Sequence, residues 1–145
     1  MVTFPLQPSF VDMPLMTKTQ PCPFCDLPKD RIIDSDANAV VIRDGFPVSE
    51  GHTLIILRRH VGSFFDISDD ERNSLFMLLG RAKRSLDQGL APGGYNVGIN
   101  DGPLAGQTVA HLHIHLIPRY QGDRADSRGG VRWIFPEKAD YWSGE

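Results

Sequence analysis

The sequence predicts a single domain that combines short β-strands with one long amphipathic helix. Three observations support this class. The chain has 145 residues, which is long enough to close a hydrophobic core without cross-links. Its composition, with 41% hydrophobic and 23% charged residues, is ordinary for a globular protein. One segment has helical periodicity, and several short apolar or alternating segments have strand periodicity.

Two strands are predicted near the amino-terminal end of this domain. Residues 1–21 are rich in proline and polar groups, and we expect an extended arm with little regular structure there. The β-branched run Ala39–Arg43 and the apolar run 52–57 then predict strands, and the turn-forming residues 44–51 separate them. This pattern is typical of a hairpin-like pair.

A long helix follows the hairpin. Ser68 and Glu71 have the spacing of a capping box, and acidic residues occupy the first turn, where the helix dipole favours them. Apolar residues then recur at steps of three and four, which predicts a helix over residues 69–87 that buries one stripe. The stripe consists of Leu75, Leu78, Leu79, Ala82 and Leu86. Gly89 and the Pro-Gly-Gly sequence after it end the helix.

Two more strands complete the predicted sheet. Residues 95–99 alternate between larger and small or polar side chains, and residues 100–103 form a turn. Residues 111–117 carry histidines on alternate positions, and we expect Pro118 to stop this strand at an edge or an end.

The spacing of these histidines decides which way they point. On a helix, positions two apart point in nearly opposite directions, whereas on a strand they share a face at a spacing of about 7 Å. The strand interpretation therefore places His111, His113 and His115 on one face. The intervening apolar residues would pack on the helix stripe from the other face; they are Leu112, Ile114 and Leu116.

Charge and hydropathy exclude several classes of partner. The net charge of −3 argues against nucleic acid as a main partner. No apolar run reaches the roughly 18 to 20 residues that span a bilayer, so we expect no membrane partner. The first residues lack the pattern of a secretory signal, which favours a cytoplasmic location. The aromatic residues near the carboxyl end are expected to pack in the core or on a dimer partner.

Three aligned imidazoles admit three interpretations. They could be hydrogen-bonding side chains on a half-exposed sheet, or ligands of a catalytic zinc ion that also holds water. Alternatively, one imidazole attacks phosphorus while the others tune and orient it. The glycine-containing residues 102–108 lead directly into the histidines and supply backbone, hydroxyl and amide donors that suit a phosphate. This loop favours the third interpretation.

The two cysteines form a Cys-x-x-Cys sequence at Cys22 and Cys25. In a reducing compartment this spacing indicates metal or redox chemistry more than a structural disulfide. The pair is a weak signal until further ligands are identified.

Residues 106–117 match the His-φ-His-φ-His-φ-φ signature of the histidine-triad family, in which φ is apolar, and the chain resembles that family over roughly residues 22–123. Residues 46–54 also resemble the family's Pro-x-x-x-Gly-His hairpin. The resemblance implies an α+β fold, in which an antiparallel sheet of about five strands packs on a long helix, and a homodimer that joins two sheets. We therefore expect a catalytic domain over residues 22–123, flanked by the extended arm (1–21) and by a tail (124–145) that packs on the domain or on the partner; the arm and the tail lie outside the resemblance or match it only loosely.

The same resemblance implies roles for individual residues. The middle histidine, His113, would attack an α-phosphate and form a covalent nucleotidyl-histidine that water then hydrolyses. His115 would position the phosphate or manage the proton of the leaving group. Asp44 would accept hydrogen bonds from ribose hydroxyls, and His52 would support the site. The residues implied for phosphate binding are Asn100, Gly106, Gln107 and Thr108.

A structural zinc site is also implied, with Cys22, Cys25, His60 and the first triad histidine, His111, as ligands. Reduced cysteines without metal, beside a surface His60, are the alternative. If His111 binds zinc, it cannot serve as a proton donor. We expect no organic cofactor.

These implications predict a nucleotide hydrolase or transferase that acts on purine nucleotide derivatives. The expected small-molecule substrates are dinucleoside polyphosphates, nucleoside phosphoramidates or adenylylated amines. A nucleotide-binding adaptor without turnover is the first alternative. A zinc-dependent hydrolase that uses the histidine triad as metal ligands is the second.

Overall fold

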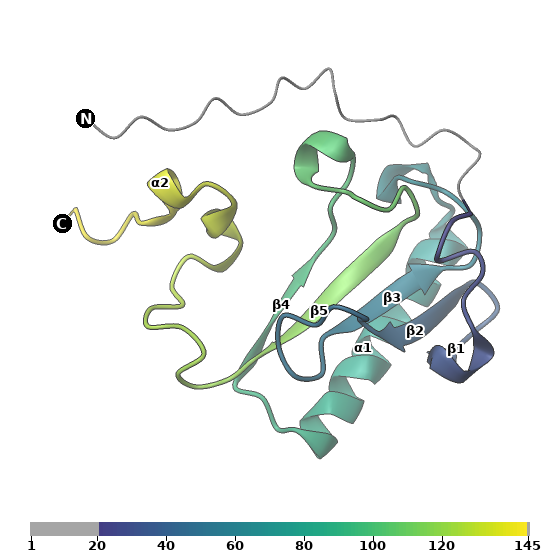
Figure 1. The fold of residues 1–145 in the computed structure, drawn as a ribbon, viewed down its shortest axis with the longest axis horizontal. Helices are drawn as coiled ribbons and strands as arrows, with labels where there is room; N and C mark the ends of the chain where they lie inside the picture. The colour runs from purple at the N-terminus through teal and green to yellow at the C-terminus, as the bar shows by residue number, and fades with distance from the viewer. Residues whose placement is uncertain (1–20, 145) are drawn as a thin grey trace.

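The computed structural model describes residues 21–144, which form a five-stranded antiparallel sheet with a long helix across one face (Figure 1). This arrangement confirms the predicted α+β class. The predicted arm lies outside the described residues except for Pro21. The strands are β1 (Ile32–Ser35), β2 (Ala39–Arg43), β3 (Thr53–Leu57), β4 (Gly94–Gly98) and β5 (His113–Arg119). The helices are α1 (Asp69–Gly89) and the one-turn α2 (Pro136–Ala139).

The order of the strands places the histidine strand inside the sheet. The order is β1-β2-β3-β5-β4, so β5 lies between β3 and the edge strand β4. Ile56 is paired with His113 and Leu54 with His115 across the β3–β5 ladder. Directly paired residues share a face of an antiparallel sheet. Both triad histidines in β5 therefore lie on the same face as Leu54 and Ile56.

Helix α1 forms as its sequence predicts. The Ser68 hydroxyl accepts a hydrogen bond from the Glu71 backbone N–H at 3.2 Å, and the Glu71 carboxylate accepts one from the Ser68 N–H at 2.9 Å. This capping box satisfies two N–H groups that the helix itself leaves unpaired. The helix buries four residues of its stripe: Leu75, Leu78, Ala82 and Leu86.

The sheet is apolar on both faces. Between the sheet and α1, the helix stripe packs with Leu112, Ile114 and Leu116, as predicted. The opposite face carries a second cluster of Val40, Ile42, Leu54 and Ile56, against which Phe24, Leu27 and Ile32 pack. The histidines of β5 lie on this second face, where His113 is buried and His115 is half-buried.

Three local predictions were wrong or incomplete. Strand β1 was not predicted as a separate element, because it has only four residues and its exposed positions interrupt any apolar run. Strand β5 begins at His113, so His111 precedes the strand instead of lying in it. The strand also continues through Pro118 to Arg119.

The pairing of the neighbouring strands explains why Pro118 does not end β5. The last β3–β5 pair joins Thr53 to Leu116, so the β3 side of Pro118 needs no ladder hydrogen bond. The Pro118 carbonyl accepts a hydrogen bond from the Ser49 hydroxyl at 2.8 Å on this side. In a strand, the N–H and C=O of one residue point to the same side. An N–H at position 118 would therefore face the β3 side, where no strand residue is paired with it, so proline removes no ladder hydrogen bond.

The carboxyl-terminal segment lies beyond the β4 edge (Figure 1). A short 3-10 helix, Gly130–Ile134, contacts β4, and α2 follows it. The Arg128 guanidinium lies over the Trp142 ring, which stabilises the segment internally. Within residues 21–144, no helix combines the length and the apolar character needed to cross a membrane.

Candidate functional site

All five histidines of the chain lie in one continuous region of the structure. His60 and His111 form one cluster with the two cysteines, and His52 and His115 form another with Asp44. His113 lies between the two clusters, since its ring is next to that of His115 and its Nδ1 atom contacts the His111 backbone.

His113 is held in one tautomer by its backbone partner. Its Nδ1 atom lies 2.7 Å from the carbonyl oxygen of His111. A carbonyl only accepts hydrogen bonds, so Nδ1 carries the hydrogen, and in the neutral imidazole the lone pair lies on Nε2. The side chain is 9% exposed, and the rings of Phe24 and His115 each lie with their centroids 5.0 Å from its own. The hydrogen bond therefore fixes Nε2 as the nitrogen through which this nearly buried side chain can accept a proton or bond to a ligand.

His52 and His115 form a directed hydrogen-bond chain. The Val48 backbone N–H donates to His52 Nδ1 at 3.2 Å, so the hydrogen of neutral His52 lies on Nε2. That Nε2 lies 3.0 Å from His115 Nδ1, which accepts the hydrogen bond. The remaining N–H of His115, on Nε2, is then free to donate to a ligand.

Burial keeps these two imidazoles neutral. Burial, together with the positive charges that His113 and His52 would carry if protonated, lowers the pKa of His115 to about 4, against the opposing effect of Asp44. Burial also lowers the pKa of His52, again opposed by Asp44. At neutral pH each ring therefore has one nitrogen that donates a hydrogen bond and one that accepts, and the hydrogen-bond chain fixes which is which.

Asp44 lies beside this chain at the start of the β2–β3 turn. Its Oδ2 atom is 3.4 Å from His52 Nε2, and its Oδ1 atom accepts the Phe46 N–H at 2.9 Å. The Asp44 N–H donates to the His52 carbonyl at 2.9 Å, so the two residues hold the turn closed. Gly51, with φ of 82°, permits this turn.

The predicted phosphate loop is folded on itself through Gln107. The Gln107 side-chain oxygen accepts the Gly102 N–H at 2.8 Å, and its amide nitrogen donates to the Gly62 carbonyl at 2.9 Å. The amide has two hydrogens, so one donor remains for a ligand. Gly106 and Thr108 are exposed on the same loop. The structure thus assigns Gln107 a structural task that the sequence did not indicate.

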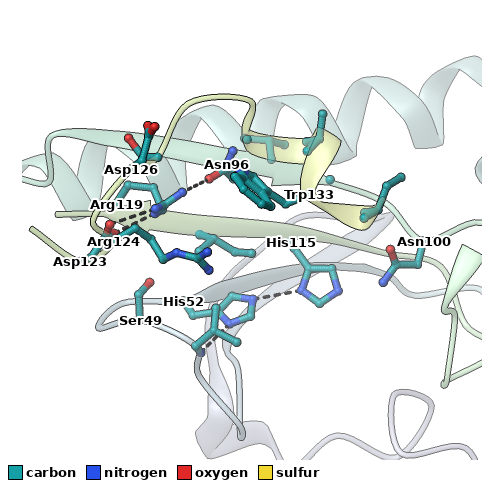
Figure 2. Close-up of a pocket in the computed structure, with 18 residues that line it drawn as sticks. Ser49, His52, Asn96, Asn100, His115, Arg119, Asp123, Arg124, Asp126 and Trp133 are labelled. Atoms are coloured by element: carbon teal, nitrogen blue, oxygen red, sulfur yellow. Dashed lines mark hydrogen bonds and ion pairs between the residues drawn. The ribbon is translucent and has the colours of Figure 1, made fainter. Parts of the chain in front are cut away.

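A cavity of about 540 Å³ adjoins His52, His115 and Asn100 (Figure 2). The carboxyl-terminal segment covers it with Arg124 and Trp133. Its volume is in the range of small-molecule sites. Asp44, His113, Gly106, Gln107 and Thr108 are not among its lining residues.

The tail residues that line this cavity were not predicted, because they lie beyond residue 123, where the resemblance to the family ends. The only signal in the sequence is the concentration of both tryptophans and several arginines near the carboxyl end. Asn96 and Arg119 also line the cavity, but Arg119 is paired with Asp123 at 2.7 Å and donates to Asn96 at 2.7 Å. Figure 2 shows these contacts on the β4–β5 side of the cavity.

The cluster of Cys22, Cys25, His60 and His111 matches the geometry of a four-ligand metal site. Tetrahedral zinc with bonds of about 2.0 to 2.3 Å separates its ligand atoms by about 3.3 to 3.8 Å. The His111 Nδ1 atom lies 3.4 Å from Cys22 Sγ, 3.6 Å from Cys25 Sγ and 3.2 Å from His60 Nδ1. Cys25 Sγ lies 3.2 Å from His60 Nδ1.

A backbone contact prepares His111 for this role. Its Nε2–H donates to the Leu57 carbonyl at 2.5 Å, which leaves the Nδ1 lone pair directed at the sulfurs. The side chain is fully buried. The residues present therefore fit zinc at this site.

The structure does not bring the three triad imidazoles together as one set of metal ligands. Among residues 21–144, His111 belongs to the cysteine cluster, His115 belongs to the Asp44 cluster, and His113 belongs to neither. His111 and His113 each use one ring nitrogen on a backbone carbonyl. This separation argues against a catalytic zinc held by the whole triad.

Several known proteins resemble this chain in sequence or in structure. A family model described as HIT domain matches residues 27–122, more than half of the 145-residue chain. An uncharacterized HIT-like protein of Mycoplasma genitalium is 35% identical over 71% of this chain and 76% of its own length. An AP-4-A phosphorylase of Mycobacterium tuberculosis is 32% identical over 70% of this chain, which spans 55% of that protein. A zinc-bound histidine triad family protein from Mycobacterium smegmatis has a similar crystal structure, with a TM-score of 0.64, 36% identity, and coverage of 72% of this chain and 79% of that one.

Proposed function

This chain belongs to the HIT family, and we propose that it is a nucleotide hydrolase or nucleotidyltransferase that cleaves at the α-phosphate of purine nucleotide derivatives. The observation that carries the proposal is the His113 tautomer. Its Nδ1–H is committed to the His111 carbonyl, so Nε2 is free to bond to phosphorus. The likeness to an AP-4-A phosphorylase supports nucleotide chemistry.

In the proposed reaction, His113 Nε2 attacks the α-phosphorus and the bond to the leaving oxygen or nitrogen breaks. The electron pair of that bond leaves with the leaving group, which takes up a proton from solvent water. The attacking ring becomes positively charged, and the His111 carbonyl stabilises it by accepting the Nδ1–H. Water then attacks the nucleotidyl-histidine, releases the nucleoside monophosphate and regenerates the neutral imidazole.

His115 would stabilise charge on the phosphoryl group. His52 fixes the His115 tautomer through the 3.0 Å hydrogen bond, so the Nε2–H of His115 is a preoriented donor. It can donate to a phosphoryl oxygen or to the leaving atom. Because its pKa is about 4, it acts as a neutral donor near pH 7 and not as an imidazolium.

Other residues would bind the nucleotide. We assign Asp44 to the ribose hydroxyls and Asn100, Gly106, Gln107 and Thr108 to the phosphate. The Gln107 amide supports this role, since its contact with the Gly62 carbonyl uses only one of its two hydrogens. The cavity between His115 and the tail supplies space for the leaving group. Dinucleoside polyphosphates, nucleoside phosphoramidates and adenylylated amines are the proposed substrate classes.

We also propose that Cys22, Cys25, His60 and His111 bind structural zinc. With four protein ligands the ion would have no open position, so it would stabilise the fold and would not activate water. It would join Cys22 and Cys25 to His60, which follows β3, and to His111, which precedes β5. The homodimer and the cytoplasmic location remain predictions, and no organic cofactor is required for the proposed reaction.

A substrate panel tests the proposed function. The three substrate classes are incubated with the protein and with His113→Ala, and mass spectrometry follows the products and the mass of the protein. We expect turnover and a nucleotidyl adduct with the unmodified protein, and nucleotide binding without either in the variant. Binding by the unmodified protein without turnover of any substrate would instead favour the adaptor alternative. Full activity of His113→Ala would refute the assignment of the nucleophile.

A further inference from the structure

Phe24 connects the cysteine cluster to the imidazole of His113. It lies between Cys22 and Cys25 in the sequence, and its half-buried ring packs against the apolar cluster on the second face of the sheet. The ring centroids of Phe24 and His113 are 5.0 Å apart at an interplanar angle of 71°. Phe24 also meets the His111 ring edge to face, at 5.9 Å and 86°.

The imidazole of His113 needs such a contact to hold its orientation. Its hydrogen bond to the His111 carbonyl selects which nitrogen carries hydrogen, but one bond leaves the ring free to turn about it. The terminal torsion of a histidine is broad, so only packing against the ring narrows it. Among residues 21–144, the aromatic neighbours of the His113 ring are Phe24 and His115, each at 5.0 Å. Of these, only Phe24 comes from outside β5.

The position of Phe24 depends on the cysteine cluster. Residues 21–28 contain no helix or strand. A single turn closes this segment, with the Cys25 N–H donating to the Cys22 carbonyl at 3.1 Å. The two sulfurs that flank Phe24 lie against His60 and His111, so an ion bound there would tether Phe24 on both sides.

We propose that Phe24 is a positioning residue for His113, and that metal binding at Cys22 and Cys25 holds its ring against the imidazole. The cysteine cluster then acts on the reaction without touching substrate, because it sets the orientation of the nucleophile. The catalytic part of this inference rests on the proposed function, whereas the orientation of the ring can be measured without any substrate.

Phe24→Leu tests the contact, because leucine keeps apolar packing on the sheet but removes the ring. Leu27→Ala is the matched control, since Leu27 packs on the same apolar cluster from the same segment. Phe24→Tyr restores an aromatic ring. For each zinc-loaded protein, the metal content, kcat and KM, the affinity for AMP and the nitrogen NMR signals of the His113 ring are measured.

We expect Phe24→Leu to lower kcat by about tenfold while KM and AMP affinity change by about twofold or less, since small misplacements of a reacting group cost rate more than binding. Its His113 ring signals should broaden or shift although zinc content is unchanged. Leu27→Ala and Phe24→Tyr should resemble the unmodified protein. A rise in KM with unchanged kcat and unchanged His113 signals would overturn the proposal and place Phe24 in contact with substrate.

The role of the metal has its own measurement. Removal of zinc by a chelator should perturb the His113 signals in the same way as Phe24→Leu, and zinc readdition should restore them. Unchanged signals after metal loss would refute the link between the cluster and the nucleophile. If the unmodified protein turned over no nucleotide, the proposed function would fail, but the NMR results would still decide whether Phe24 and the metal orient His113.

Discussion

The Nδ1 atom of His113 and the backbone carbonyl of His111 are 2.7 Å apart, so one triad histidine fixes the tautomer of the next through its main chain. The His111 side chain meanwhile faces the cysteines, and its Nε2–H donates to Leu57. A single residue therefore contributes to the candidate metal cluster with its ring and to the candidate nucleophile with its backbone.

This relationship predicts the behaviour of His113→Asn. The asparagine amide can occupy the place of Nδ1 and donate to the His111 carbonyl, but it offers no nucleophile. We expect the variant to bind AMP within about twofold of the unmodified protein and to lose at least about 10³-fold in kcat, without a nucleotidyl adduct. Calorimetry and intact-protein mass spectrometry measure these two effects. An adduct on the variant would show that another residue is the nucleophile.

The lowered pKa of His115 predicts a loss of stability in acid. Its folded pKa of about 4 lies below the ordinary histidine pKa of 6.5, so the unfolded state binds the proton more tightly. The contribution is fully present above pH 6.5 and is lost as the pH falls towards 4. Because His115 is partly exposed, we expect the loss to be well below the limit of about 3.4 kcal/mol that the full shift in pKa would give.

Urea unfolding at pH 7 and pH 4.5 measures the effect. The difference in unfolding free energy between the two pH values should be smaller in His115→Gln than in the unmodified protein. Comparing the two proteins cancels the contributions of groups that do not contact His115, such as the cysteine cluster and its metal. Equal pH dependence in both would contradict the burial effect assigned to His115.

The cysteine cluster predicts that zinc content and stability change together. Cys22→Ala should lose bound zinc and melt at a lower temperature, because a structural metal site contributes binding energy to folding. Asp26→Ala is the control, since Asp26 is an exposed neighbour of Cys25 outside the cluster. Metal analysis and thermal unfolding with and without chelator measure both quantities. Unchanged zinc in Cys22→Ala would remove this cysteine from the ligand set.

The turn that holds Asp44 and His52 predicts a sharp requirement for glycine at position 51. Gly51 has φ of 82°, and an added Cβ would lie 2.8 Å from side-chain atoms of Leu86 and Leu90. We expect Gly51→Ala to cost about 1 to 3 kcal/mol of unfolding free energy. Gly89→Ala is the matched control, because a Cβ there meets nothing within 4 Å, and alanine favours the helix by up to about 1 kcal/mol. Chemical denaturation should give opposite signs for the two variants.

The elements with strong local signals were predictable from the sequence. The capping box and leucine stripe located α1, and the β-branched run located β2, because these patterns depend on nearest neighbours along the chain. The start of β5 was misplaced because the alternation of His111 with Leu112 continues past the ladder. Periodicity reports which side chains alternate, whereas the extent of a strand depends on where its partners end.

The site could be predicted only in part for a similar reason. The resemblance predicted His60 as a ligand beside the cysteines and His52 as a supporting residue of the site, and the structure places His60 against Cys25 and His52 against His115. The Gln107 bonds to Gly102 and Gly62 and the approach of Phe24 to His113 depend on tertiary packing that no local pattern records. The tail residues over the cavity likewise come from a segment outside the family motif.

The cavity beside His115 predicts that the tail discriminates among leaving groups. Trp133 and Arg124 line it, and the Arg124 guanidinium lies 5.9 Å from the centre of the Trp133 ring. Trp133→Ala should lower kcat/KM by about tenfold for a substrate with a bulky aromatic leaving group, since a lost aromatic contact is worth about 0.5 to 1.5 kcal/mol beyond its buried area. For a small leaving group, and for AMP affinity, the change should be about twofold or less. Tyr141→Ala is the control, because Tyr141 is an exposed aromatic residue of the tail that does not line the cavity. Equal losses for both substrates would assign Trp133 to the fold of the tail and not to leaving-group recognition.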